Sequence, residues 1–137
     1  MRQFHLVYPV FLGLILLFSL ESNAFAHGDD APGPHGGVIR MPGAFHTEIV
    51  SLDKRKVVIY LLDIQFKEPI TEKSSVNVSI LQESKTMPLQ CKTEKDRFIC
   101  TTPSGITLDT GTLDVVAKRR EVQGVAVKYP LPIPGKS

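Results

Sequence analysis

No stretch of this chain carries the apolar stripe, repeating every three to four residues, that marks an amphipathic helix. The sequence also lacks a nucleophile elbow, a phosphate-binding glycine loop and a paired-carboxylate motif, so conventional hydrolysis and phosphoryl transfer are not expected. Its 16 basic and 14 acidic residues give a net charge of +2, without the clustered basic face that binds nucleic acid. These absences point away from an enzyme and toward a binding protein.

The amino terminus has the pattern of a cleaved secretory signal peptide over residues 1–26. Arg2 supplies the positive charge, residues 6–20 form an apolar run of fifteen, and Ala24-Phe25-Ala26 is the small-residue cleavage signal. This run is shorter than the roughly 20 residues that cross a bilayer, and no cysteine directly follows it as a lipid anchor would require. We therefore expect a periplasmic or secreted protein with no stable membrane anchor after cleavage.

The rest of the chain reads as one domain built from short strands. Residues 27–34, rich in Gly, Pro and Asp, predict a flexible N-terminal arm; residues 35–130 predict the domain; residues 131–137 predict a Pro-rich C-terminal tail. Apolar, β-branched blocks separated by turn residues indicate an all-β fold, an antiparallel β-sandwich that is Ig-like or small-barrel-like, with about seven or eight short strands. The expected strands are residues 37–41, 45–52, 56–63, 75–82, 86–93, 97–101, 112–119 and 122–129.

The two cysteines, Cys91 and Cys100, predict a disulfide across a hairpin. Their spacing places a two-residue turn at Lys95-Asp96, with Cys91 directly opposite Cys100. An exported protein meets the oxidising conditions in which such bonds persist. The alternative, two thiolate metal ligands, suits a reducing compartment or a closer spacing such as C-x-x-C.

A second hairpin gathers the residues best suited to chemistry. With Pro42 and Gly43 as the central residues of a type II turn, Met41 pairs with Ala44 and Gly37 lies opposite Glu48. This register puts the side chains of His35, His46 and Glu48 on one face, because opposed residues and residues two apart share a face. Gly37 leaves space there for an ion.

Imidazole and carboxylate groups are ordinary ligands for copper and zinc, so His35, His46 and Glu48 form a candidate metal site. In the competing interpretation, His35 caps a strand, Gly36-Gly37 shapes a bulge, and His46 and Glu48 lie on a solvated face. His27 would become the new amino terminus after cleavage and can chelate copper through its amine and ring, although a solvated arm also explains it. Met41 is a possible soft ligand for Cu(I), and a packed thioether is its simpler role.

The motifs Pro34-His35-Gly36-Gly37-Val38 and His46-Thr47-Glu48-Ile49-Val50 resemble a P-H-G-G … H-x-E pattern of small exported bacterial β-domains. A related pattern occurs near the amino ends of periplasmic adaptors of heavy-metal RND efflux pumps. The resemblance implies a compact β-domain that handles metal in the periplasm, with His35, His46 and Glu48 at the metal-binding positions. This chain lacks the helical hairpin and lipoyl-like segment of a complete adaptor, and the cysteine pair is not part of the pattern.

From these features we expect a periplasmic copper- or zinc-binding protein that acts as a chaperone, a buffer or an accessory to heavy-metal efflux, with a periplasmic efflux component as a possible partner. A metal-free module for protein–protein interaction in an envelope complex, using sheet edges or the Pro-rich tail, is the alternative. A copper oxidase or oxygenase built on the amine of His27 is a third, more remote, interpretation.

Overall fold

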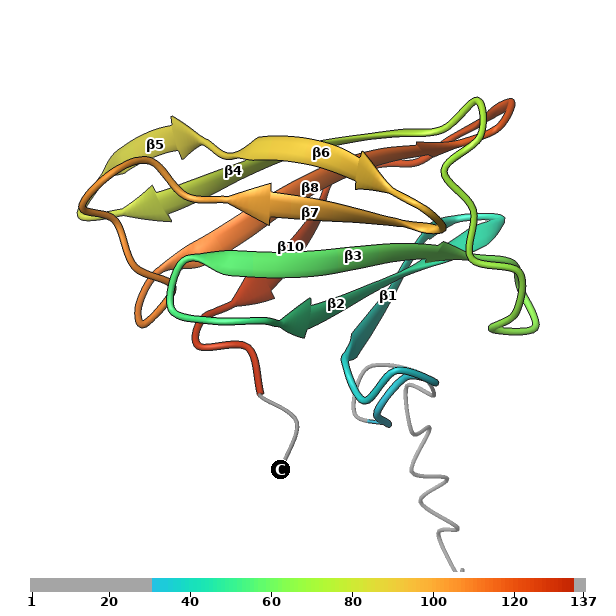
Figure 1. Ribbon diagram of the computed structural model, residues 1–137, viewed down its shortest axis with the longest axis horizontal. Helices are drawn as coiled ribbons and strands as arrows, with labels where there is room; N and C mark the ends of the chain where they lie inside the picture. The colour runs from blue at the N-terminus through green and yellow to red at the C-terminus, as the bar shows by residue number, and fades with distance from the viewer. Residues whose placement is uncertain (1–30, 135–137) are drawn as a thin grey trace, which may run out of the picture.

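The computed structural model describes residues 31–134, and these form a sandwich of two antiparallel sheets (Figure 1). The first sheet has the order β1-β2-β3-β7-β6; the second has the order β10-β8-β4-β5, with β9 also paired to β8. The ten strands are β1 (Val38–Gly43), β2 (Phe45–Ser51), β3 (Lys56–Leu62), β4 (Ser75–Gln82), β5 (Lys85–Pro88), β6 (Gln90–Glu94), β7 (Arg97–Thr101), β8 (Thr112–Arg119), β9 (Val122–Gln123) and β10 (Val127–Pro130). The predicted antiparallel β-sandwich is confirmed.

The strand count exceeds the expected seven or eight because two predicted strands are each divided. Residues 86–93 form the end of β5 and most of β6, separated at Leu89, where the chain leaves the second sheet and enters the first. Residues 122–129 form β9 and β10, separated around Gly124, whose N–H donates to the carbonyl of Ala117. At the first break the hydrogen-bonding partner changes from β4 to β7, whereas β9 and β10 on either side of the second break both pair with β8.

The core between the sheets takes one side of each strand. In β4, Val76, Val78 and Ile80 are buried and alternate with more exposed polar residues, as the sequence pattern predicts. Strand β3 is buried on both sides, which its unbroken apolar run also predicts. Its second face forms a smaller apolar cluster on the outer surface of the first sheet, made of Ile39, Val50, Val58, Tyr60 and Leu62 with Ile99 packed against them.

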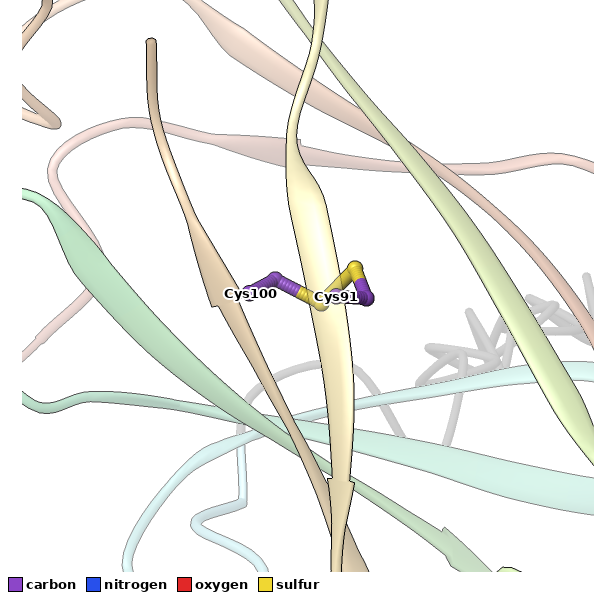
Figure 2. The surroundings of a disulfide bond; sticks show 2 residues. All are labelled: Cys91 and Cys100. Atoms are coloured by element: carbon purple, nitrogen blue, oxygen red, sulfur yellow. A yellow bond between two sulfur atoms is a disulfide. The ribbon is translucent and has the colours of Figure 1, made fainter. Parts of the chain in front are cut away.

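The predicted disulfide joins Cys91 of β6 to Cys100 of β7 (Figure 2). The two residues are directly opposite each other, and Glu94 pairs with Arg97 around the Lys95-Asp96 turn, so the predicted register is confirmed. Cys100 is fully buried in the core, while Cys91 packs against it from the edge of the sheet. The bond therefore fastens the edge strand of the first sheet to its neighbour.

The predicted register of the β1–β2 hairpin is wrong by two residues. Ile39 lies opposite Glu48 instead of His46, and β1 continues to Gly43, which pairs with Phe45 after an irregularity that follows Arg40. Proline 42 supplies no N–H to a ladder, and its carbonyl accepts a hydrogen bond from Val125 at 2.9 Å, which draws the end of β1 toward the strand that follows β9. Over Val38–Arg40 a shift of two residues leaves the side chains on their predicted faces, but the predicted type II turn is wrong, because Gly43 lies in β1 and lacks the positive φ that such a turn requires.

The ends of the described chain pack against the sandwich. Pro32, in the expected flexible arm, bridges to Val38, and the N–H of Gly33 donates to the carbonyl of Gly37 at 2.8 Å. At the other end, Ile133 is buried in the core. In residues 31–134 no helix is long and apolar enough to cross a membrane.

Candidate metal centre on the outer face of the first sheet

A buried glutamate organises the outer face of the first sheet. Glu48 lies in the middle of β2, between Ile39 of β1 and Tyr60 of β3, and its residue exposure is 0%. One carboxylate oxygen, Oε1, accepts hydrogen bonds from the backbone N–H groups of His35 at 2.8 Å and Gly37 at 2.9 Å. The other, Oε2, accepts one from His35 Nδ1 at 2.7 Å. We call these three bonds the Glu48 clamp, since they hold residues 35–37 against β2.

Glycine at two positions allows the chain to approach the carboxylate this closely. A Cβ atom on Gly33 would lie 2.4 Å from Glu48 Cδ, and one on Gly37 would lie 2.3 Å from the carbonyl oxygen of Ile49. Between them Gly36 has a φ of 78°, a conformation that side chains disfavour. Gly33, together with the two glycines of the P-H-G-G pattern, therefore lets the backbone close over Glu48, a role that their spacing in the sequence does not reveal.

The ring of His35 is fixed from two directions. It stacks on Tyr60 with centroids 3.7 Å apart and planes 4° from parallel, while Nδ1 bonds to the carboxylate of Glu48. A carboxylate only accepts hydrogen bonds, so Nδ1 carries a proton; in the neutral form of the ring, the lone pair then lies on Nε2. With the His35 side chain 30% exposed, this ring is not sealed from solvent.

The ring of His46 also carries its proton on Nδ1. Its Nδ1 lies 3.0 Å from the carbonyl oxygen of Asp63, which again requires a proton on Nδ1 and leaves the lone pair on Nε2. One ring face stacks on Phe66 at 4.1 Å with planes 21° apart, and the residue is only 7% exposed. The solvated position expected in the competing interpretation is wrong for both His46 and Glu48.

The loop after β3 carries the groups that hold His46. Asp63 Oδ1 accepts from the backbone N–H groups of Gln65 at 2.8 Å and Lys67 at 2.9 Å, and the bond from Lys67 is the main cause that lowers the pKa of this carboxyl. Within that turn Phe66 has a φ of 61°, which is unusual for a bulky residue and places its ring on His46. A hollow of about 180 Å³ lies between Phe66, Ile39 and residues 31–34.

The structure brings two of the three predicted ligands into contact. His35 and Glu48 are bonded directly, and His46 lies on the same face of β2 two residues from Glu48, which is roughly 7 Å along a strand. Both oxygens of Glu48 are engaged by the clamp, so this residue fits an orienting role better than direct ligation. Residues 31–134 contain no group of three or more His, Cys, Asp or Glu side chains placed to hold a metal ion. The two imidazoles fit a copper or zinc ion in donor type, and the full three-ligand set does not.

Two candidates remain, Met41 and His27, and the structure describes only Met41. Met41 is 59% exposed on β1, so the expected packing of its thioether is not found. His27 lies outside the described residues. Conversely, sequence reasoning missed Tyr60, Asp63 and Phe66; the only signal was the position of Asp63 at the end of a buried strand, directly before a loop that contains an aromatic residue.

No family model matches this sequence, and neither the curated proteins nor the solved structures contain a match to it.

Proposed function

We propose that this protein binds a copper or zinc ion through Nε2 of His35 and Nε2 of His46 in an exported compartment, as a chaperone, a buffer or an accessory to heavy-metal efflux. The observation that carries the proposal is that both rings use the same nitrogen, Nδ1, as the hydrogen-bond donor. Each Nδ1 donates to an oxygen, Glu48 for one and the Asp63 carbonyl for the other, and each Nε2 keeps its lone pair. Metal-binding histidines commonly have this arrangement, in which the second nitrogen donates to a carboxylate or carbonyl.

In this proposal Glu48 is a positioning residue. Its carboxylate fixes the tautomer and the orientation of His35, and the two backbone bonds keep the carboxylate itself in place. Tyr60 and Phe66 hold the rings by stacking, so little ring freedom is lost when a metal binds. The protein thus supplies pre-oriented nitrogen donors. The metal, when bound, would offer its open coordination positions to a partner.

Two protein nitrogens leave coordination positions open to water or to a donor from another protein. Structural zinc sites, in contrast, are closed by four protein ligands. An open site suits capture and release, which is why a chaperone or buffer role is proposed rather than a structural one. The Cys91–Cys100 disulfide supports an oxidising, exported setting.

Isothermal titration of the exported protein with Cu(II) and with Zn(II) tests this proposal. We expect one ion per chain, with an affinity that falls as the pH is lowered because protons compete for the same nitrogens. His46→Ala and His35→Ala should each abolish or strongly weaken binding. A control variant, Lys92→Ala, changes an exposed residue of β6 at the opposite edge of the first sheet and should bind the ion as the parent does. Equal binding by the His46→Ala variant and the parent would remove the assigned site.

A sharper variant is Glu48→Gln. The Gln oxygen can still accept from His35 N–H and Gly37 N–H, but its NH₂ group would face His35 Nδ1 and favour the opposite tautomer, with the proton on Nε2. We expect zinc affinity to fall by roughly 10- to 100-fold with the fold retained, as for loss of other groups that orient a metal-binding histidine. Unchanged affinity in a folded Glu48→Gln protein would contradict the positioning role.

A metal-free interaction module is the second candidate function. The observation in its favour is that the Glu48 clamp satisfies its own donors and acceptors without an ion, and that residues 31–134 hold no three-residue ligand group. A protein that binds neither ion in the titration, yet retains a partner after chelation and after loss of both histidines, would favour this candidate.

A further inference from the structure

One edge of the second sheet is only partly covered. Strand β4 pairs with β8 over Ser75–Leu81, but on its other side β5 covers only Ser79–Gln82. After Pro88 the chain turns away, the N–H of Leu89 donates to the carbonyl of Val78 at 2.9 Å, and β6 begins in the first sheet. Within the part of the chain that the structure describes, residues 75–77 therefore have no strand on this side. Figure 1 shows β5 leading into β6 along this border of the sandwich.

The open edge presents backbone groups. Carbonyl and N–H directions alternate along a strand, so the N–H and C=O of Val76 point to the same side as the carbonyl of Val78, away from β8. Natural sheets usually protect such an edge with a Pro, a charged side chain or a bulge. Residues 75–77 are Ser, Val and Asn, and they pair with β8 in unbroken register. This edge is thus open to strand addition.

A groove of about 420 Å³ follows this edge. Four consecutive residues of β4 line it, as expected for a groove along the side of a strand. The chain that crosses between the sheets and two residues of β8 complete the lining. The lining residues are Val76, Asn77, Val78, Ser79, Pro88, Leu89, Cys91, Asp114 and Val116. Because Cys91 is bonded to Cys100, the wall opposite β4 is covalently fastened to the first sheet.

Asp114 places a negatively charged carboxylate in the groove. It lies on β8 opposite Ser79, and its Oδ2 accepts from Lys128 Nζ at 3.1 Å. The other oxygen, Oδ1, is buried and has no hydrogen-bond partner among the described residues. The Asp114 side chain is 36% exposed, so a basic side chain of a ligand in the groove can approach this carboxylate beside Lys128.

We propose that this groove binds an extended segment of a partner protein, which adds as a strand at Val76 and places a Lys or Arg side chain against Asp114. Main-chain hydrogen bonds supply affinity and the basic side chain supplies selectivity, as in other complexes formed by strand addition. A second copy of this chain is a poorer occupant, because a two-fold contact would set one recessed edge against another. This inference stands independently of metal binding.

Capped pentapeptides titrated into ¹⁵N-labelled exported protein provide the test. The reference peptide is acetyl-Thr-Val-Lys-Val-Thr-amide, and a second peptide carries Glu in place of its Lys. Two further peptides carry N-methyl groups either on the second and fourth residues or on the first, third and fifth, so that each blocks the N–H groups of one edge only. We expect the reference peptide to shift the amide signals of Val76 and Val78 and to slow hydrogen exchange at Val76.

One N-methylation pattern should weaken binding at least about tenfold and the other should be tolerated, since an added strand pairs through a single edge. The Glu peptide should bind more weakly than the Lys peptide, and Asp114→Asn should remove this preference. The proposal is overturned if no peptide perturbs Val76 at millimolar concentration, or if both methylation patterns act equally. It is likewise overturned if sedimentation shows that the free protein dimerises through this edge.

Discussion

The hairpins β6–β7 and β1–β2 of the first sheet are each held by a cross-link, and the two cross-links differ in kind. In β6–β7 a disulfide joins directly opposed residues of the same hairpin. At β1–β2 the Glu48 clamp joins a strand to residues eleven and thirteen positions earlier through three hydrogen bonds. The covalent link needs only two matched positions, whereas the clamp needs a dry environment, two backbone donors and a correctly oriented ring. Only the clamp, however, fixes the proton position on a histidine, which is why the candidate site lies there.

This contrast predicts that the clamp contributes more to stability than the disulfide. Glu48→Ala removes the acceptor of three hydrogen bonds and leaves buried donors unsatisfied, so we expect a loss of about 3 kcal/mol or more in the free energy of unfolding. Urea denaturation followed by circular dichroism measures it. The matched control is Glu94→Ala, which removes an exposed partner of Arg97 and should cost under about 0.5 kcal/mol. A loss below about 1 kcal/mol for Glu48→Ala would mean that the clamp is incidental to the fold.

Removal of the disulfide should have the next largest effect. The Cys91→Ala, Cys100→Ala double variant frees a loop with a sequence separation of 9 and should lose about 2 to 3 kcal/mol, because the unfolded chain regains conformational freedom. The same denaturation experiment measures it. Metal affinity should remain at the parent value, since neither cysteine touches the Glu48 clamp or either histidine. A parallel loss of metal binding would show that the two hairpins are coupled.

The smallest effect in this series concerns a single methyl group. Gly33→Ala would bring a Cβ atom within 2.4 Å of Glu48, so we expect displacement of residues 33–37, a loss of roughly 1 to 3 kcal/mol and weaker metal binding. Gly43→Ala is the matched control in β1, where the nearest atom to an added Cβ is 3.7 Å away. Thermal unfolding of both variants distinguishes them. Equal melting temperatures would place the 33–37 segment farther from Glu48 than the structure has it.

The two hairpins also differ in how far the sequence predicts them. The β6–β7 register follows from a two-residue turn and two symmetric cysteines, all within ten residues. The β1–β2 pairing is irregular between Arg40 and Gly43, where the Pro42 carbonyl accepts a hydrogen bond from Val125, a residue far away in the chain. Local turn rules could not include it, so the prediction failed by two residues while the alternation of faces still held.

The same limit applies to the candidate site. Residue type and alternation placed His46 and Glu48 on one face and brought His35 near them. They could not indicate that the backbone N–H groups of His35 and Gly37 donate to the Glu48 carboxylate, because a pattern of side chains carries no information about backbone donors. Nor could they identify Tyr60 and Phe66 as the rings that hold the histidines, since each contact depends on the tertiary fold.

The long-range ¹H–¹⁵N NMR spectrum of the histidine rings, recorded before and after one equivalent of Zn(II), tests the ring tautomers and the metal binding together. We expect His35 and His46 both to carry the proton on Nδ1 without metal, and the Nε2 signals of both rings, and no others, to move together on saturation. A proton on Nε2 of either ring in the metal-free protein, or spectra that zinc leaves unchanged, would rule out the proposed site.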